Sequence, residues 1–132
     1  MKYLLDTNIC VFFLRGKLNL DQIIKEKGRE NCYISEITIA ELKYGATKSP
    51  RAEHHHKILS EFLSTIQVIP IIDLLDDYAV ERVRLEKLGI RIDDFDLLIG
   101  ITAVVNRFTM ITNNVKHLGR IKNIKIEDWS LS

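Results

Sequence analysis

Three carboxylates in apolar surroundings are the side chains of this sequence best suited to do chemistry. Asp6 directly follows an apolar start, Glu41 lies in the apolar run 39–42, and Asp96 begins the apolar run 96–99. A buried carboxylate is costly unless a positive charge neutralises it. No Lys or Arg in these runs is placed to pair with all three acids, so a hard divalent cation is the simplest partner for them.

The positions of Glu41 and Asp96 on predicted helices favour the same interpretation. Side chains three and four residues apart share a helix face, so Glu41 points where Ile37 and Tyr44 point. Gly45 lies one turn beyond Glu41, and a glycine also follows Asp96 at the same spacing, which suggests that space beside each acid is needed. Each acid alone also fits a structural role, as a glutamate at the edge of an amphipathic helix or an aspartate at an N-cap. Three such acids from distant parts of the chain are harder to explain in that way and indicate a metal site.

Length and composition limit the class of protein. The chain has 132 residues, which we expect to form one domain of ordinary size, 1–132, around one core. A formal net charge of +1 gives no general argument for a polyanion partner, so any contact with RNA must depend on local patches. The two cysteines, Cys10 and Cys32, are too few for a disulfide framework or a four-thiolate zinc site. No signal peptide or membrane-spanning run is evident, which predicts a cytoplasmic protein.

Alternating strand-like and helical segments predict an α/β fold. We expect strands at 2–5, 32–34, 68–71, 109–112 and 125–127, and helices at 8–15, 20–27, 36–47, 51–64, 73–88, 96–106 and 117–121. Asp6 or Thr7, Asn19, Ser35 and Asp73 are the expected first residues or caps of four helices. Strands separated by helices favour right-handed crossovers, and therefore a three-layer α/β/α sandwich with a central parallel sheet of four to five strands. Pro70 cannot donate a hydrogen bond to a sheet, so its strand lies at an edge or ends there.

The carboxyl ends of the strands are the expected location of the functional site. Parallel sheets of this class bind ligands at that rim, where the loops leave the strands. Asp6 follows the first strand, and Asn113 and Asn114 follow the strand at 109–112. The rim therefore collects polar side chains from both ends of the chain.

Five motifs, in order along the chain, resemble those of one protein family. They are Leu5-Asp6-Thr7-Asn8, Glu41 with Tyr44-Gly45-Ala46, Gly89-Ile90 leading to Phe95-Asp96 and Ile99, Thr112-Asn113-Asn114, and Glu127-Asp128-Trp129. Each motif is weak evidence by itself, but five at spacings that cover nearly the whole chain are strong evidence. The sequence resembles, from end to end, the PIN-domain ribonucleases of the VapC type, which are the toxins of bacterial type II toxin–antitoxin systems.

The resemblance implies a biochemical function. It implies an endoribonuclease that depends on Mg²⁺ or Mn²⁺ and cleaves RNA phosphodiester bonds. It also implies a homodimer, and a small antitoxin that holds the toxin inactive and binds operator DNA, so that DNA is contacted only through the antitoxin. Asp6, Glu41 and Asp96 take the positions of the family's metal-binding, catalytic acids.

Position 114 departs from the wider PIN pattern. Asn114 stands where many PIN domains carry a fourth acid, and a neutral amide is a weaker ligand for a hard cation. Whether the site holds one metal ion or two therefore stays open. Asp93 and Asp94 are candidates to supply the missing charge, although both precede the predicted helix and also fit ordinary loop acids.

The expected mechanism uses a water activated by the metal. The cation lowers the pKa of a bound water, orients that water in line with a phosphodiester, and stabilises charge on the phosphate oxygens. Asn8, Thr112 and Asn114 are candidates to hydrogen-bond water or phosphate beside the acids. For Asn8 and Thr112, a simpler role at a helix start and a strand end fits the sequence equally well.

Three other features are weaker candidates for function. The histidines at 54–56 point about 100° apart on a helix, so they cannot chelate one ion and indicate a solvated face. Phe12, Phe13 and Leu14 lie in a helix too short to bury all three, which predicts an exposed apolar patch and a protein partner. Basic residues flank the acids and are candidates for phosphate contacts, namely Arg15, Lys17, Lys43, Lys48, Arg91, Lys116, His117 and Arg120.

Two other classes of function are alternatives. A receiver-like α/β signalling domain also clusters acids, but its phosphorylated aspartate follows a middle strand, where this chain has helical sequence around 51–54. A non-catalytic PIN-fold binding module would be favoured by the loss of a metal-binding acid. All three acids are present in this chain, which favours an enzyme.

Overall fold

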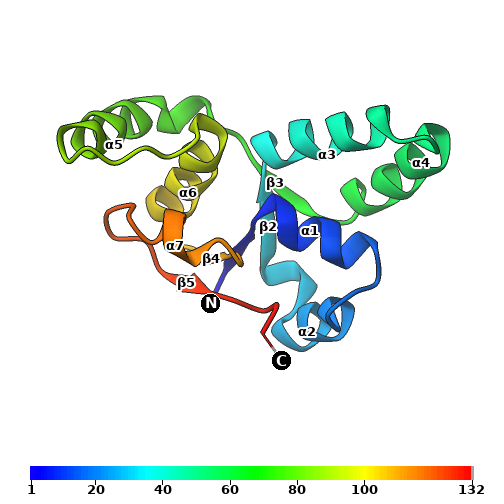
Figure 1. Ribbon diagram of the computed structural model, residues 1–132. Coiled ribbons are helices and arrows are strands. Elements are labelled where there is room, and N and C mark those ends of the chain that lie inside the picture. The colour runs from blue at the N-terminus through cyan, green and yellow to red at the C-terminus, as the bar shows by residue number, and fades with distance from the viewer. Residues whose placement is uncertain (132) are drawn as a thin grey trace.

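Five short strands form the centre of the computed structural model, which describes residues 1–131. They are β1 (Tyr3–Leu5), β2 (Cys32–Ser35), β3 (Gln67–Ile69), β4 (Thr109–Ile111) and β5 (Ile126–Glu127). The strands pair in the order β3-β2-β1-β4-β5, and every pair is parallel (Figure 1). All five carboxyl ends therefore lie at one edge of the sheet, with β1 in the middle.

Seven α-helices accompany these strands in the described residues. They are α1 (Thr7–Leu14), α2 (Leu20–Lys27), α3 (Glu36–Lys48), α4 (Ala52–Leu63), α5 (Leu75–Lys87), α6 (Asp94–Asn106) and α7 (Val115–Leu118). Short 3₁₀ turns at Arg29–Asn31 and Ile72–Leu74 precede β2 and α5. The predicted α/β class and the parallel sheet of four to five strands are confirmed. No helix within residues 1–131 is both long and apolar enough to cross a bilayer.

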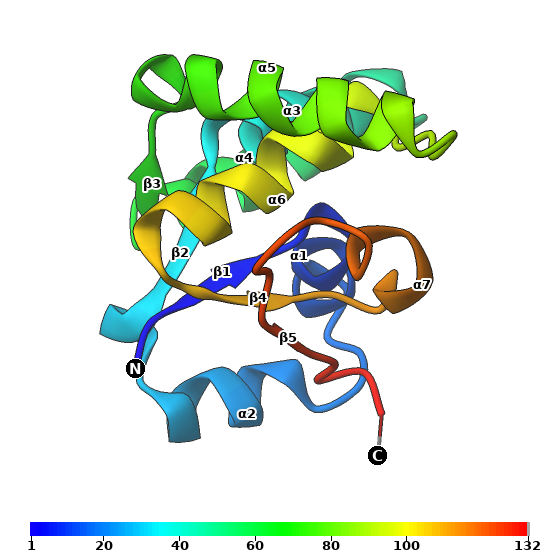
Figure 2. The same cartoon turned by 90° about the vertical axis from the view of Figure 1, so that its left-hand side faces the viewer.

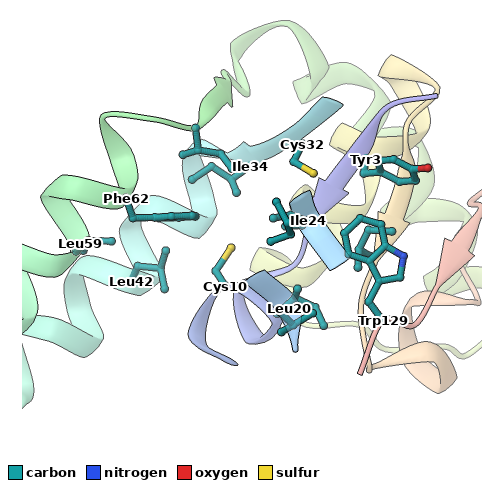
Figure 3. Packing of buried hydrophobic residues seen from close by; sticks show 14 of the residues in the cluster. Tyr3, Cys10, Leu20, Ile24, Cys32, Ile34, Leu42, Leu59, Phe62 and Trp129 are labelled. Atoms are coloured by element: carbon teal, nitrogen blue, oxygen red, sulfur yellow. The ribbon is translucent and has the colours of Figure 1, made fainter. Parts of the chain in front are cut away.

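Side chains alternate between the two faces of the sheet, and each face has its own core cluster. Leu5 packs in a first cluster, mainly with α1, α2, α3 and α4, whereas its neighbour Leu4 packs in a second cluster with α5, α6 and α7. Figure 2 shows these layers, with α5 and α6 above the strands and α2 below them. The first cluster includes Tyr3, Cys10, Leu20, Ile24, Cys32, Ile34, Leu42, Leu59, Phe62 and Trp129 (Figure 3). This arrangement is the predicted three-layer sandwich, and both cysteines are buried as free thiols within it.

The helix that carries Asp96 begins earlier than the sequence predicts. α6 starts at Asp94, and Asp93 is its N-cap. The Asp93 carboxylate accepts hydrogen bonds from the backbone N–H of Phe95 at 3.1 Å and of Asp96 at 3.4 Å. The prediction that both preceding acids are loop residues was therefore wrong, and so was the N-cap alternative for Asp96, because Asp93 already performs that role.

Two other predicted helix starts also differ from the structure. Asn19 precedes α2 with a left-handed backbone, φ 54°, and its side chain makes no capping hydrogen bond. Asp73 lies inside a 3₁₀ turn, so the long helix begins at Leu75 instead. Ser35 does cap α3, since its hydroxyl accepts a hydrogen bond from the Ile37 N–H at 3.1 Å. The last short helix spans 115–118 instead of 117–121.

The side chains at 12–14 do not form the exposed patch that the sequence predicts. Phe12, Phe13 and Leu14 are half-buried and pack against the first cluster. Phe13 lies beside Phe62 of α4, with 5.6 Å between the ring centroids. The prediction of a fully exposed patch was wrong because the three side chains pack against the first cluster, with Phe62 of α4 against the Phe13 ring, which the length of α1 alone does not reveal.

Candidate active site

Asp6 lies at the carboxyl end of the central strand and is 4% exposed. Its backbone N–H donates to the Ile111 carbonyl at 2.8 Å, which extends the pairing of β1 with β4 by one residue. Its carboxylate accepts a hydrogen bond from the Thr7 N–H at 2.8 Å and another from the Thr112 hydroxyl at 2.7 Å. Burial raises the pKa of Asp6 above its ordinary value, although these two hydrogen bonds oppose the rise.

Glu41 reaches the same rim from α3, which begins directly at the end of β2. The Thr7 hydroxyl donates to the Glu41 carboxylate at 2.7 Å and lies 3.1 Å from the Thr38 hydroxyl. Burial is the main cause of a raised pKa for Glu41, and the charges of Asp6 and Asp93 raise it further. Thr7 therefore links two of the predicted acids, since its N–H binds one and its hydroxyl binds the other.

Asp96 completes the group from the first turn of α6. Burial raises the pKa of Asp96 to about 6, and the neighbouring charges of Asp6, Asp93 and Glu41 contribute to the rise, in that order. The three acids predicted from the sequence thus lie close enough to destabilise one another's ionised forms. Asp93 lies near them, since its charge contributes to the raised pKa values of Glu41 and Asp96.

Within the described residues, these acids form no ion pair with a basic side chain. The ion pairs of residues 1–131 join Arg82 or Arg84 to Glu81, Glu86 and Asp94, and none involves the three predicted acids. The atoms at the rim that could bind a metal ion are carboxylate and hydroxyl oxygens, which fit a hard divalent cation such as Mg²⁺ or Mn²⁺. The acids do not yet converge on one point, because no group of three His, Cys, Asp or Glu side chains in the described chain forms a ready metal cluster.

Asp96 opens onto a surface cavity of about 390 Å³ that it shares with Asp93, Arg91, Asn114 and His117. The Asn114 N–H donates to the Thr112 hydroxyl at 2.9 Å, and the Asn114 amide oxygen lies 2.8 Å from His117 Nδ1. The Thr112 hydroxyl therefore links the loop after β4 to the Asp6 carboxylate by two hydrogen bonds. The structure places Asn114 beside the acids, where its amide side chain faces the same cavity as Asp96.

The remaining candidates lie in different surroundings. Asn8 is exposed on the first turn of α1, and no hydrogen bond in the described residues joins its side chain to the acids. Asp94 turns toward α5, where its carboxylate accepts a hydrogen bond from the Tyr78 hydroxyl at 2.8 Å and pairs with Arg82 at 3.2 Å. Of the two acids that the sequence left open, Asp93 is thus the neighbour of the site.

The two glycines that follow the acids lie in different surroundings. A Cβ atom on Gly45 would meet no other atom within 4 Å, so that position is open space. A Cβ atom on Gly100 would collide with the side chain of Ile121, which belongs to the second core cluster. Gly100 is thus required for packing α6, so the prediction of needed space beside the acid was wrong for Asp96. Gly45 lines the same open groove as Glu41, and for Glu41 the need for space stays a prediction.

Thr7 and Thr38 are the residues at this site that sequence reasoning missed. Thr7 was considered only as a helix cap, and Thr38 is fully buried one turn before Glu41. A buried threonine one helical turn from a predicted metal-binding acid is a usable signal, because its hydroxyl needs a hydrogen-bond partner inside the protein.

Comparison with known proteins matches this geometry to one family. Residues 3–123 match the PIN domain family. Ribonuclease VapC2 of Rickettsia felis is 37% identical over 135 residues, with 98% of each chain covered. The tRNA(fMet)-specific endonuclease VapC of Salmonella typhimurium is 32% identical over 136 residues, again with 98% of each chain covered. The chain belongs to the VapC group of the PIN-domain family.

Solved structures of VapC-containing complexes share the fold. A chain of VapBC2 from Rickettsia felis, bound to a DNA fragment from its promoter, has a TM-score of 0.91 at 35% identity and covers 98% of this chain and 99% of its own. A chain of DNA-bound VapBC from Salmonella typhimurium also has a TM-score of 0.91, at 30% identity, with 98% of both chains covered. The predicted resemblance is confirmed. The receiver-like alternative was wrong, since residues 51–54 lie at the start of α4 and not after a strand.

Proposed function

We propose that this chain is the ribonuclease toxin of a VapC-type toxin–antitoxin pair and that Asp6, Glu41 and Asp96 are its catalytic acids. The observation that carries the proposal is geometric: Thr7 binds both Asp6 and Glu41 at the carboxyl edge of the sheet, and Asp96 lies near them. All three acids have raised pKa values, and none of them forms an ion pair within residues 1–131. Such an arrangement costs stability in the protein alone. Two relatives carry the names ribonuclease and endonuclease, which supports the same activity here.

A divalent cation held by these three acids, with Asp93 beside them, is part of the proposal. When bound, Mg²⁺ or Mn²⁺ supplies a water of lowered pKa and stabilises charge on the oxygens of the cleaved phosphodiester. Asp96 is the acid with the strongest need for a cation, because its pKa of about 6 leaves part of it protonated near neutral pH. The acids form no ready ligand cluster in the described residues, so binding of a cation requires their side chains to reorient.

The threonines orient the acids during this chemistry. Thr112 and Thr7 hold opposite oxygens of the Asp6 carboxylate, so that carboxylate keeps one orientation at the end of β1. The Thr7 hydroxyl also fixes one oxygen of Glu41 and leaves the other free. Oriented carboxylates bind a cation with little loss of side-chain entropy, which favours a defined site over a diffuse acidic surface.

A groove beside Glu41 supports the proposal of an antitoxin partner. It has a volume of about 390 Å³, and aliphatic side chains of α1, α3 and α4, including Val11, Leu14 and Leu59, line it together with Glu41. A segment of a small antitoxin packed into this groove would cover Glu41 and block the site. The solved VapBC complexes place a partner on two similar chains. A homodimer, and contact with operator DNA through the antitoxin alone, complete the proposal.

Cleavage of RNA by the purified protein tests the proposal. We expect cleavage of single-stranded or structured RNA with Mg²⁺ or Mn²⁺ and none in excess EDTA, because the acids by themselves supply no nucleophile. Restored cleavage on adding back the cation is the matched control for damage by the chelator. Undiminished cleavage in EDTA would exclude the metal-dependent mechanism, and binding of RNA without cleavage would favour the non-catalytic module.

A further inference from the structure

A second cavity lies directly beside the proposed active site. It has a volume of about 320 Å³ and lies between α5, the segment at 90–93 and the start of α6. We call it the side cavity. Arg91, Ile92 and Asp93 line both the side cavity and the cavity that contains Asp96. These three residues form the boundary between the two spaces, so a ligand that reaches Asp96 lies next to the side cavity.

The floor of the side cavity is apolar. Leu85 of α5 and Leu97 of α6 are 2% and 1% exposed and belong to the second core cluster, and Ile90 and Ile92 add aliphatic surface. A volume of this size lies at the lower end of ordinary ligand pockets, which combine apolar walls with a few polar groups at the mouth. The charged side chains of Arg82, Glu86, Asp93 and Asp94 also line the side cavity. The cavity therefore offers aliphatic surface for a flat heteroaromatic ring, such as a nucleobase, and charged groups that can hydrogen-bond the edge of that ring.

The two arginines at the mouth of the side cavity differ in what they can bind. The Arg82 guanidinium is already occupied, since it donates to the Tyr78 hydroxyl at 2.8 Å and pairs with Asp94 at 3.2 Å. Arg91 is exposed, and within the described residues it takes part in no ion pair. A guanidinium that is unpaired in the described residues and lines the same cavity as Asp93 and Asp96 is suited to a phosphate group, because it offers several N–H donors in one plane.

We propose that the side cavity is a nucleotide subsite for the RNA substrate. This inference rests on the proposed function. One unpaired base next to the cleaved phosphodiester lies on the floor of Leu85, Ile90 and Leu97, and its backbone phosphate binds Arg91. Recognition of single-stranded RNA by splayed-out bases in apolar pockets is common among RNA-binding proteins. Arg91 also offsets the negative charge of Asp93 and Asp96, which would otherwise repel the RNA backbone.

The salt dependence of RNA binding tests the role of Arg91. The probe is a fluorescent single-stranded oligoribonucleotide that the wild-type protein cleaves, and binding is measured by anisotropy in an Asp96→Asn background that prevents cleavage. We expect Arg91→Ala to weaken binding about tenfold and to reduce the slope of log affinity against log salt concentration by about 0.7, the value for one phosphate of a single strand. Arg51→Ala, an exposed arginine at the start of α4, is the matched control and should change neither quantity. An unchanged slope in Arg91→Ala would overturn the assignment.

Removal of single bases from the RNA tests the cavity itself without altering the protein. We expect an abasic nucleotide at one position flanking the cleaved bond to raise KM about tenfold, as for loss of one stacked base, with a smaller effect further away. A uniform KM across all abasic substrates, with normal cleavage, would overturn the subsite and leave the proposed function intact. Failure of the wild-type protein to cleave any RNA would overturn both.

Discussion

Buried carboxylates at two places in this protein have pKa values shifted in opposite directions. Glu81 of α5 is 6% exposed, and Arg84 donates to both of its oxygens at 2.7 Å. The Lys122 N–H donates to it as well, at 2.7 Å. The hydrogen bonds from Arg84 are the largest cause that lowers the pKa of Glu81. Asp6 is equally buried, at 4%, yet it receives only a hydroxyl and an amide donor, and its pKa is raised.

The difference separates a carboxylate whose charge is neutralised within the chain from carboxylates whose charge is not. Glu81 joins α5 to the segment that follows α7 through its hydrogen bond with the Lys122 N–H, and Arg84 neutralises its charge. The acids at the rim lack that neutralisation, so they disfavour their own ionised state in the protein alone. Burial alone therefore does not mark a candidate functional acid, whereas burial with a raised pKa and no basic partner does.

The largest expected difference between the two kinds of carboxylate is in catalysis. Asp96→Asn should reduce RNA cleavage about a thousandfold, equivalent to about 4 kcal/mol in the activation barrier, because the lost charge weakens cation binding and activation of water. Glu81→Gln is the control, and it should cleave at a near-normal rate at temperatures where it is folded. Steady-state cleavage assays on both variants make the measurement. Near-normal cleavage by folded Asp96→Asn would remove it from the site.

The second expected effect is a loss of stability, and it should follow from changing Glu81 and not the acids at the rim. Glu81→Gln should reduce the free energy of unfolding by about 2 kcal/mol, since it leaves the Arg84 guanidinium without its charged partner; the partial exposure of Arg84 keeps the loss moderate. Urea denaturation monitored by circular dichroism measures this change. A loss below about 0.5 kcal/mol would mean that solvent replaces Glu81 at little cost.

A third effect tests the cation by a readout other than cleavage. Mn²⁺ or Mg²⁺ at ten times its Kd should raise the free energy of unfolding by about 1.4 kcal/mol, as for any ligand that binds only the folded state. Asp6→Asn and Asp96→Asn should lose most of this gain in a thermal-shift assay, while Glu81→Gln should keep it. An equal gain in all four proteins would place the cation elsewhere.

The smallest effect concerns pH, and its sign differs between the two groups. The folded-state pKa of Asp96, about 6, lies above its ordinary value of 3.8, so the stability linked to its bound proton is fully present below pH 3.8 and lost as pH rises through 6. In chelator at pH 7, Asp96→Asn should therefore be about 1 kcal/mol more stable than wild type, a figure reduced for solvent screening of this half-buried group. The gain should vanish near pH 3.5.

For Glu81 the direction is reversed. Its lowered pKa contributes stability above the ordinary value of 4.5, and that contribution is lost as pH falls through the folded-state pKa. Unfolding measurements from pH 3 to pH 7.5 should thus show the cost of Glu81→Gln shrinking in acid, just as the gain from Asp96→Asn does. A gain from Asp96→Asn that is independent of pH would contradict the raised pKa.

Much of the rim was predictable, because the chain itself carries the relevant patterns. Asp6 and Thr112 directly follow the strands that end there, and parallel strands place their carboxyl ends together. The choice between Asp93 and Asp94 was not predictable. It depends on the cap of α6, where Asp93 lines the same cavity as Asp96 and Asp94 binds Tyr78 of α5.

The sequence by itself determined the alternation of strands and helices, the parallel sheet and the identity of the three acids, because periodicity, caps and short motifs are properties of neighbouring residues. Only the tertiary structure decided how the acids are held. The hydrogen bonds of Thr7 to Glu41 and of Thr112 to Asp6 join segments far apart in the chain, and they form only when α1, α3 and β4 pack against β1. The lack of a basic partner is likewise a property of the packed molecule, since nothing in the order of residues prevents a distant arginine from reaching the rim.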